Sequence, residues 1–167
     1  MIQIQELIKL LENGIVRESK SMNKELIEAL KVVLADTYAF GLKAQNYHWN
    51  VTGPNFAQYH EFFGDVYSDA SGAVDIIAEG IRTLDAYAPG SFIRFKDLTT
   101  IDDETNIPES LSMISKLTND NRKVLASLYE AYNLAESSKK HGISNFIQDR
   151  ITAHDKWAWM LKSFIKA

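Results

Sequence analysis

The chain has 167 residues, of which 46% are hydrophobic and 24% are charged, and its net charge is −4. These values are ordinary for a globular chain, and the length suits one domain, residues 1–167, with a sizeable core. The absence of cysteine excludes disulfides and thiolate metal sites. No apolar run approaches the roughly eighteen residues of a membrane helix, and the N-terminus lacks a signal-peptide pattern. We therefore expect a cytoplasmic protein with no membrane partner.

The first half of the chain predicts helices that carry two histidines. Residues 1–13 predict a short amphipathic helix that ends at Gly14, within an N-terminal helix or tail of residues 1–20. A long helix follows from about Ser21 to Asn50, and its apolar seam ends at His48. Gly53-Pro54 breaks that helix, and a second helix begins near Phe56 with His60 on its apolar stripe.

The second predicted helix also carries two carboxylates, Asp75 and Glu79, four residues apart. An i,i+4 pair can reach one point, and histidine with carboxylate is a ligand set suited to iron or zinc. His60 and Asp75 are separated by about 22 Å along a straight helix, whereas metal–ligand bonds are about 2 Å long. If all four side chains bind one ion, the histidines and the carboxylates must therefore come from different chains. An antiparallel pairing of this helix with its own copy would build two identical sites.

The second half of the chain predicts an all-α four-helix bundle. Residues 86–108 leave the helical pattern, as a long crossover between parallel neighbours would, with one short extra helix between helices two and three. The third helix begins at Pro108, with Leu111 on its buried stripe and Gly142 as its C-cap, and the fourth begins near Ser144. No Glu is followed by His three residues later, which disfavours a di-iron site inside one bundle.

The sequence HWN, then GPNF, then a histidine on the next helix and D-x-x-x-E within VDIIAE resembles the signature of the Dps miniferritins, the ferritin-like DNA-binding proteins from starved cells. The resemblance extends over nearly the whole chain, including the terminal HDKWAWMLKSF. It implies a ferritin-like bundle that assembles with itself into a dodecamer. It also implies that His48 and His60 of one subunit, with Asp75 and Glu79 of its two-fold mate, form a ferroxidase site.

The chain departs from the family pattern at one position. The family usually carries a further carboxylate four residues after the second histidine, where this chain has Gly64. Asp65 follows, but it lies about 140° round an ideal helix from His60. Either a second metal site is weakened, or another group or water takes the place of the carboxylate. By the same resemblance, Trp49 could absorb oxidising equivalents and Asp149 could line an iron-entry pore, although ordinary packing and surface roles remain open for both.

The resemblance therefore implies a ferroxidase that oxidises Fe(II) with hydrogen peroxide, or more slowly dioxygen, and stores the ferric mineral, with zinc as a competing occupant. One alternative is a DNA-compacting architectural protein in which iron is secondary, because some Dps proteins bind DNA through an N-terminal tail. Lysines and arginines of that segment are balanced here by glutamates, so we expect DNA binding to be weak or absent. A second alternative is a shell without oxidase activity, suggested by Gly64.

Overall fold

The computed structural model describes residues 4–165, without the side chains of residues 4–8 and 10–19. This part of the chain forms five helices and no strands: α1 Ile4–Asn50, α2 Phe56–Arg82, α3 Phe92–Leu98, α4 Ser110–Ser137 and α5 His141–Ile165. The prediction of an all-α four-helix bundle with a short extra helix in the crossover is confirmed. None of the described helices is long and apolar enough to span a membrane.

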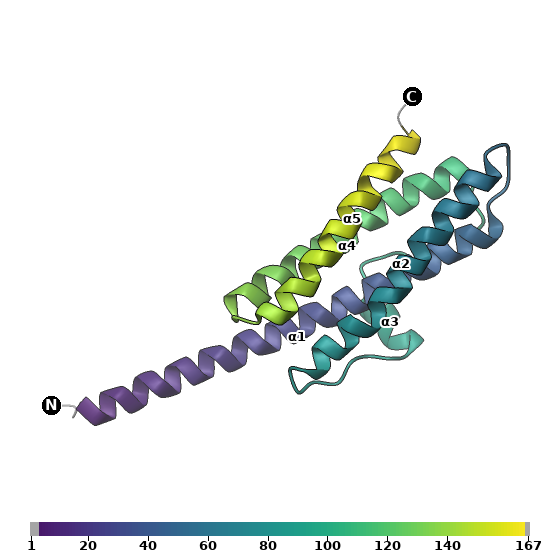
Figure 1. Cartoon of the computed structure of the whole chain (residues 1–167). Coiled ribbons are helices and arrows are strands. Elements are labelled where there is room, and N and C mark those ends of the chain that lie inside the picture. Colours follow the sequence, from purple (N-terminus) through teal and green to yellow (C-terminus); the bar gives the residue numbers. More distant parts are fainter. Residues whose placement is uncertain (1–3, 166–167) are drawn as a thin grey trace.

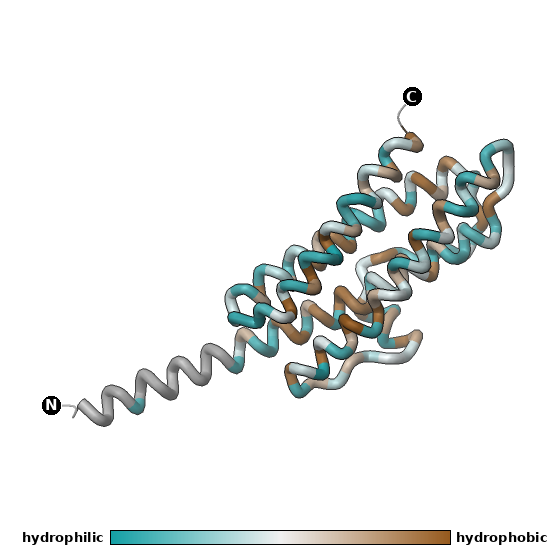
Figure 2. Tube along the Cα trace, viewed as in Figure 1, coloured by the Kyte–Doolittle hydropathy of each residue, from teal (hydrophilic) through white to brown (hydrophobic). Residues whose placement is uncertain are grey.

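The bundle consists of two helical hairpins, α1–α2 and α4–α5, packed against each other (Figure 1). α2 and α4 run in the same direction, so residues 83–109 must return along the bundle, and α3 lies on that return path (Figure 1). Hydrophobic and hydrophilic residues alternate along the long helices (Figure 2), and the hydrophobic residues include the buried core positions of each of them. The largest side chains in the core include Tyr47, Phe40 and Phe63, all with no solvent exposure.

Buried polar groups hold the crossover against the bundle. The carboxylate of Asp36, fully buried on α1, accepts hydrogen bonds from the Thr99 hydroxyl at 2.8 Å and from the Thr100 amide at 2.7 Å. Further along α1, Lys43 Nζ meets Asp120 Oδ2 of α4 at 2.6 Å, with both side chains more than 90% buried. These contacts join α1 to the crossover and to α4.

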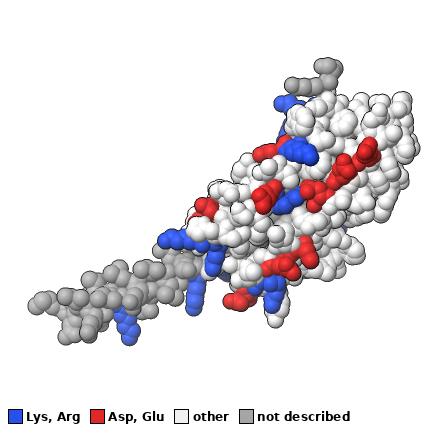
Figure 3. Space-filling view, in the orientation of Figure 1, with Lys and Arg blue, Asp and Glu red and all other residues white. Residues whose placement is uncertain are grey.

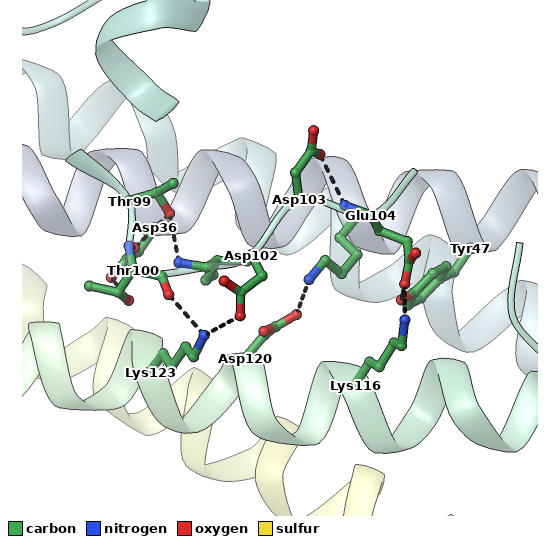
Figure 4. Close-up of polar contacts among 12 residues, drawn as sticks. Asp36, Tyr47, Thr99, Thr100, Asp102, Asp103, Glu104, Lys116, Asp120 and Lys123 are labelled. Atoms are coloured by element: carbon green, nitrogen blue, oxygen red, sulfur yellow. Dashed lines mark hydrogen bonds and ion pairs between the residues drawn. The ribbon is translucent and has the colours of Figure 1, made fainter. Parts of the chain in front are cut away.

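The crossover also carries carboxylates that meet lysines of α4 (Figure 4). Asp102 contacts Lys123 at 3.0 Å, and Glu104 accepts from both Lys116 and the Tyr47 hydroxyl. Burial raises the pKa of Tyr47, and the Glu104 carboxylate adds to this. Tyr47 therefore stays protonated and donates its hydrogen bond to Glu104.

A second polar cluster links α2, α4 and α5 around His154. Asn121 Nδ2 donates to the His154 backbone oxygen, so the Asn121 Oδ1 faces His154 Nδ1 and accepts a hydrogen bond from it at 2.7 Å. Arg150 makes two hydrogen bonds to Asp69, which also accepts from Trp157 Nε1 at 2.8 Å. Burial, together with the Arg150 guanidinium, lowers the pKa of His154 to about 3. His154 is therefore a neutral core histidine.

Four details of the sequence prediction are wrong. No separate helix ends at Gly14, because α1 runs unbroken through it; a helix-interior glycine costs only about 1 kcal/mol, too little to end a helix that continues on both sides. Leu111 is 57% exposed because it lies in the first turn of α4, next to the crossover rather than within the bundle. Gly142 is not a C-cap: α4 ends at Ser137, and Lys139 adopts the left-handed conformation there. α5 accordingly begins at His141, one turn earlier than predicted.

The buried neutral His154 predicts a pH dependence of stability. In the unfolded chain this histidine protonates near pH 6.5, whereas the folded chain resists protonation until about pH 3. The unfolding free energy should therefore fall as the pH drops below about 6.5, by up to about 1.4 kcal/mol per pH unit. Chemical unfolding between pH 6.5 and 5 should show a shallower dependence in His154→Gln than in the wild type. Equal slopes would contradict the assignment.

Candidate metal centre

The α1–α2 hairpin places the two predicted histidines face to face. His48 lies in the last turn of α1, and His60 lies in the second turn of α2, at equal distances in sequence from Pro54 in the loop. The loop turns at Gly53, whose φ of 111° is a conformation that side chains disfavour. The Phe56 amide donates to the Gly53 oxygen at 3.0 Å and starts α2. A short turn with one glycine thus brings both imidazoles to one end of the bundle.

Each imidazole is held by the backbone of the other histidine. His48 Nδ1 lies 2.7 Å from the His60 carbonyl oxygen, and His60 Nδ1 lies 2.7 Å from the His48 carbonyl oxygen. A carbonyl oxygen only accepts, so each Nδ1 must carry the proton and donate it. In the neutral form, each Nε2 then has a free lone pair. Metal-binding histidines are commonly fixed in this way, because a hydrogen bond at one nitrogen sets the tautomer and the ring orientation.

The rings stack on each other and on neighbouring aromatic side chains. The His48 and His60 ring centroids are 3.8 Å apart, with 22° between the planes. Phe56 stacks on the His60 ring at 5.1 Å, and Tyr67 meets His48 edge-on at 5.3 Å. Both histidines remain partly exposed. Because a metal binds in the plane of an imidazole, two nearly parallel rings cannot both bind one ion unless one of them turns.

The structure keeps the two carboxylates away from the histidines within one subunit. α2 is a single helix from Phe56 to Arg82, so fifteen residues separate His60 from Asp75 by about 22 Å. Asp75 and Glu79 are both solvent-exposed, and so are Gly72 and Ile76 beside them. Within the described residues, no three histidines and carboxylates gather closely enough to hold a metal ion. Within one subunit, the histidine pair, which comes from α1 and α2, therefore lies apart from the carboxylate pair of α2.

Other residues singled out in the sequence lie on the surface. Asp65 and Asp149 are solvent-exposed, and the Trp49 side chain is 64% exposed beside His48. The sequence did not reveal the contact between Tyr67 and His48, although Tyr67 lies about two helical turns beyond His60 on the same stripe. The sequence also did not reveal the reciprocal hydrogen bonds from each histidine ring to the other histidine's carbonyl oxygen, because a side-chain pattern contains no information on backbone acceptors.

Comparison with known proteins identifies relatives over most of the chain. Residues 27–167 match the model of the ferritin-like domain family. An uncharacterized low temperature-induced protein of Nostoc is 31% identical over 143 residues, which cover 84% of this chain and 80% of the relative. DNA protection during starvation protein 2 of Bacillus anthracis is 28% identical over 144 residues, covering 86% and 99% of the two chains.

Solved structures show the same similarity. The crystal structure of a Dps protein from Vibrio cholerae, described as a member of a broad superfamily of ferritin-like diiron-carboxylate proteins, superposes with a TM-score of 0.83. The two chains are 28% identical, and the match covers 87% of this chain and 92% of the other.

The turn that pairs the histidines provides a direct test of this geometry. Gly53→Ala should lower the unfolding free energy by about 1–3 kcal/mol, because alanine disfavours the positive φ at this position. Gly90→Ala is the matched control, since Gly90 is a loop glycine without a positive φ and an added Cβ meets no described atom within 4 Å. Thermal or chemical unfolding of both variants measures the difference, and equal stabilities would contradict a strained turn at Gly53.

Proposed function

Because the chain belongs to the ferritin-like family and is a Dps miniferritin, we propose that it oxidises Fe(II) with hydrogen peroxide at sites shared between subunits and stores the ferric product. Iron storage and protection against oxidative damage are general functions of this family, and ferroxidase-type activity belongs to the superfamily. The observation that carries the proposal is the pair of imidazoles, His48 and His60, whose Nδ1 atoms donate to carbonyl oxygens and thereby leave each Nε2 for a metal.

A second copy of the chain supplies the missing half of the site in this proposal. α2 of a two-fold mate, running antiparallel, brings Asp75 and Glu79 to His48 and His60, and the reverse pairing makes the second site. The exposed surface of α2 around Asp75 suits such contact, since Gly72 allows close approach and Ile76 offers apolar area. Six such pairs would form the dodecameric shell that the family resemblance implies.

The side chains have distinct roles in the proposed reaction. Asp75 and Glu79 carry the negative charge that attracts Fe(II), while the imidazoles bind it as softer nitrogen ligands. Two Fe(II) ions and one hydrogen peroxide, with two protons, give two Fe(III) ions and two water molecules, so no hydroxyl radical is released. Zn(II) has the same ligand preferences and is expected to compete for the site.

DNA compaction is the second candidate function. Acidic and basic side chains are interspersed over the face shown in Figure 3, and the net charge of the chain is −4. Binding to a phosphate backbone depends on clustered positive charge. These observations favour the ferroxidase over the DNA-compacting function.

Subunit mixing tests whether the proposed site is shared. We expect a His48→Ala/His60→Ala chain and an Asp75→Ala/Glu79→Ala chain each to assemble and to oxidise Fe(II) no faster than buffer. After dissociation and reassembly together, each mixed pair regains one intact site, so random mixing restores about a quarter of the sites. Formation of ferric absorbance after addition of Fe(II) and peroxide measures the recovery. No recovery in mixed shells confirmed by mass would contradict a shared site.

The DNA-compacting function has a separate test. A mobility-shift titration of wild-type protein with duplex DNA at 50 and 200 mM salt should show weak binding at both concentrations. Tight binding at low salt that falls steeply, by a factor of about 10³ or more, would instead indicate several phosphate contacts and favour the DNA-compacting function.

A further inference from the structure

Tyr67 is an oxidisable side chain in contact with the candidate metal centre. It lies on α2, about two turns beyond His60, and its ring meets the His48 ring edge-on with 5.3 Å between the centroids. α2 passes close to His48 in this region, since a Cβ built on Gly64, about one turn before Tyr67, would lie 3.0 Å from His48 Nδ1. A metal bound to His48 would therefore be linked to the Tyr67 ring through a single imidazole.

Trp49 follows His48 in the sequence but is placed differently. Its side chain is 64% exposed. In the described part of the chain, the other aromatic side chains whose rings contact His48 or His60 are Tyr67 and Phe56. A phenylalanine ring is far harder to oxidise than a phenol. Of the side chains in contact with the histidine pair, Tyr67 is therefore the one suited to give up an electron.

The electron count of the proposed reaction creates a need for such a donor. Hydrogen peroxide takes up two electrons to become two water molecules, and each Fe(II) gives one. This chain has Gly64, and thus no carboxylate, at the position that the family uses for a further ligand. When peroxide meets a centre that holds a single Fe(II), one electron is missing, and one-electron reduction of peroxide would release a hydroxyl radical.

We propose that Tyr67 supplies the second electron when a single Fe(II) is bound at the centre. One Fe(II), the Tyr67 phenol, one hydrogen peroxide and one proton then give one Fe(III), a neutral tyrosyl radical and two water molecules. The O–O bond breaks, iron and phenol are each oxidised by one electron, and the phenolic proton ends on a peroxide oxygen. A further Fe(II) reduces the radical, with uptake of a proton, and restores Tyr67. Because Tyr67 is only partly buried, solvent can supply that proton.

Electron paramagnetic resonance after rapid freezing tests this inference, which rests on the proposed function. Anaerobic wild-type protein with one Fe(II) per histidine pair, mixed with one equivalent of peroxide, should give Fe(III) and a tyrosyl radical, whose spectrum narrows when the tyrosines are ring-deuterated. Tyr67→Phe should lose the radical, and a spin trap should detect hydroxyl radical in its place. Trp49→Phe should keep the tyrosyl signal. Tyr129→Phe is the matched control and should also keep it, because Tyr129 is a half-exposed tyrosine of α4.

Co(II) binding shows whether the loss of the phenol disturbs the centre itself. Tyr67→Phe retains the ring that meets His48, so anaerobic Co(II) titration, followed by visible absorption, should give the wild-type affinity. A merely structural role of Tyr67 would move this affinity and leave the radical of the remaining loaded centres in place. If the affinity falls in Tyr67→Phe, the hydroxyl acts in metal binding and the inference is wrong.

The outcomes separate the inference from the proposed function. If the wild type forms Fe(III) with peroxide but no tyrosyl radical, the inference alone is wrong. The same holds if the radical persists in Tyr67→Phe or disappears in Trp49→Phe. If the wild type oxidises Fe(II) no faster than buffer, the proposed function is wrong.

Discussion

The reciprocal hydrogen bonds between the two histidines and each other's carbonyl oxygens are the constraint on which the candidate centre depends. Both distances are 2.7 Å, and both bonds require the proton on Nδ1. The acceptors belong to the last turn of α1 and the second turn of α2, so the imidazoles are fixed by the same backbone that closes the hairpin. The fold of one hairpin therefore sets the tautomer of both imidazoles, and one ring must still turn for both to bind one ion.

The rest of the bundle supports that hairpin from the opposite side. Lys43 of α1 pairs with Asp120 of α4 in the interior, and Tyr47, next to His48, donates to Glu104 of the crossover. α1 is thus tied to both α4 and the crossover within two turns of the candidate ligand. Removing one partner of a buried ion pair leaves an uncompensated charge, which is among the most destabilising single changes in a protein. The position of His48 therefore depends on contacts far along the chain.

Periodicity in the sequence correctly predicted the helices. The chemistry assigned to the candidate site stays a prediction, and the sequence did not predict the local geometry of that site. The three- and four-residue steps from Phe56 predicted α2, and the rise of that helix predicted that His60 and Asp75 cannot meet within one subunit. The predicted helix end at Gly14 was wrong because a single glycine does not end a helix that continues on both sides. The predicted burial of Leu111 was wrong because apolar spacing does not show where a helix leaves the bundle. The close approach of Gly64 to His48 depends on the packing of two helices, which a pattern along one chain does not contain.

The rigidity of α2 has a consequence for when iron chemistry can begin. His60, paired with His48 of α1, lies near the start of α2, and Asp75 and Glu79 lie near its end, too far apart to cooperate within one chain. Under the proposed pairing, a single chain has no ferroxidase activity until it pairs with a second copy, and each pairing forms two sites at once. Iron oxidation would therefore begin only once subunits assemble, so that the ferric mineral forms within the shell rather than on unassembled chains.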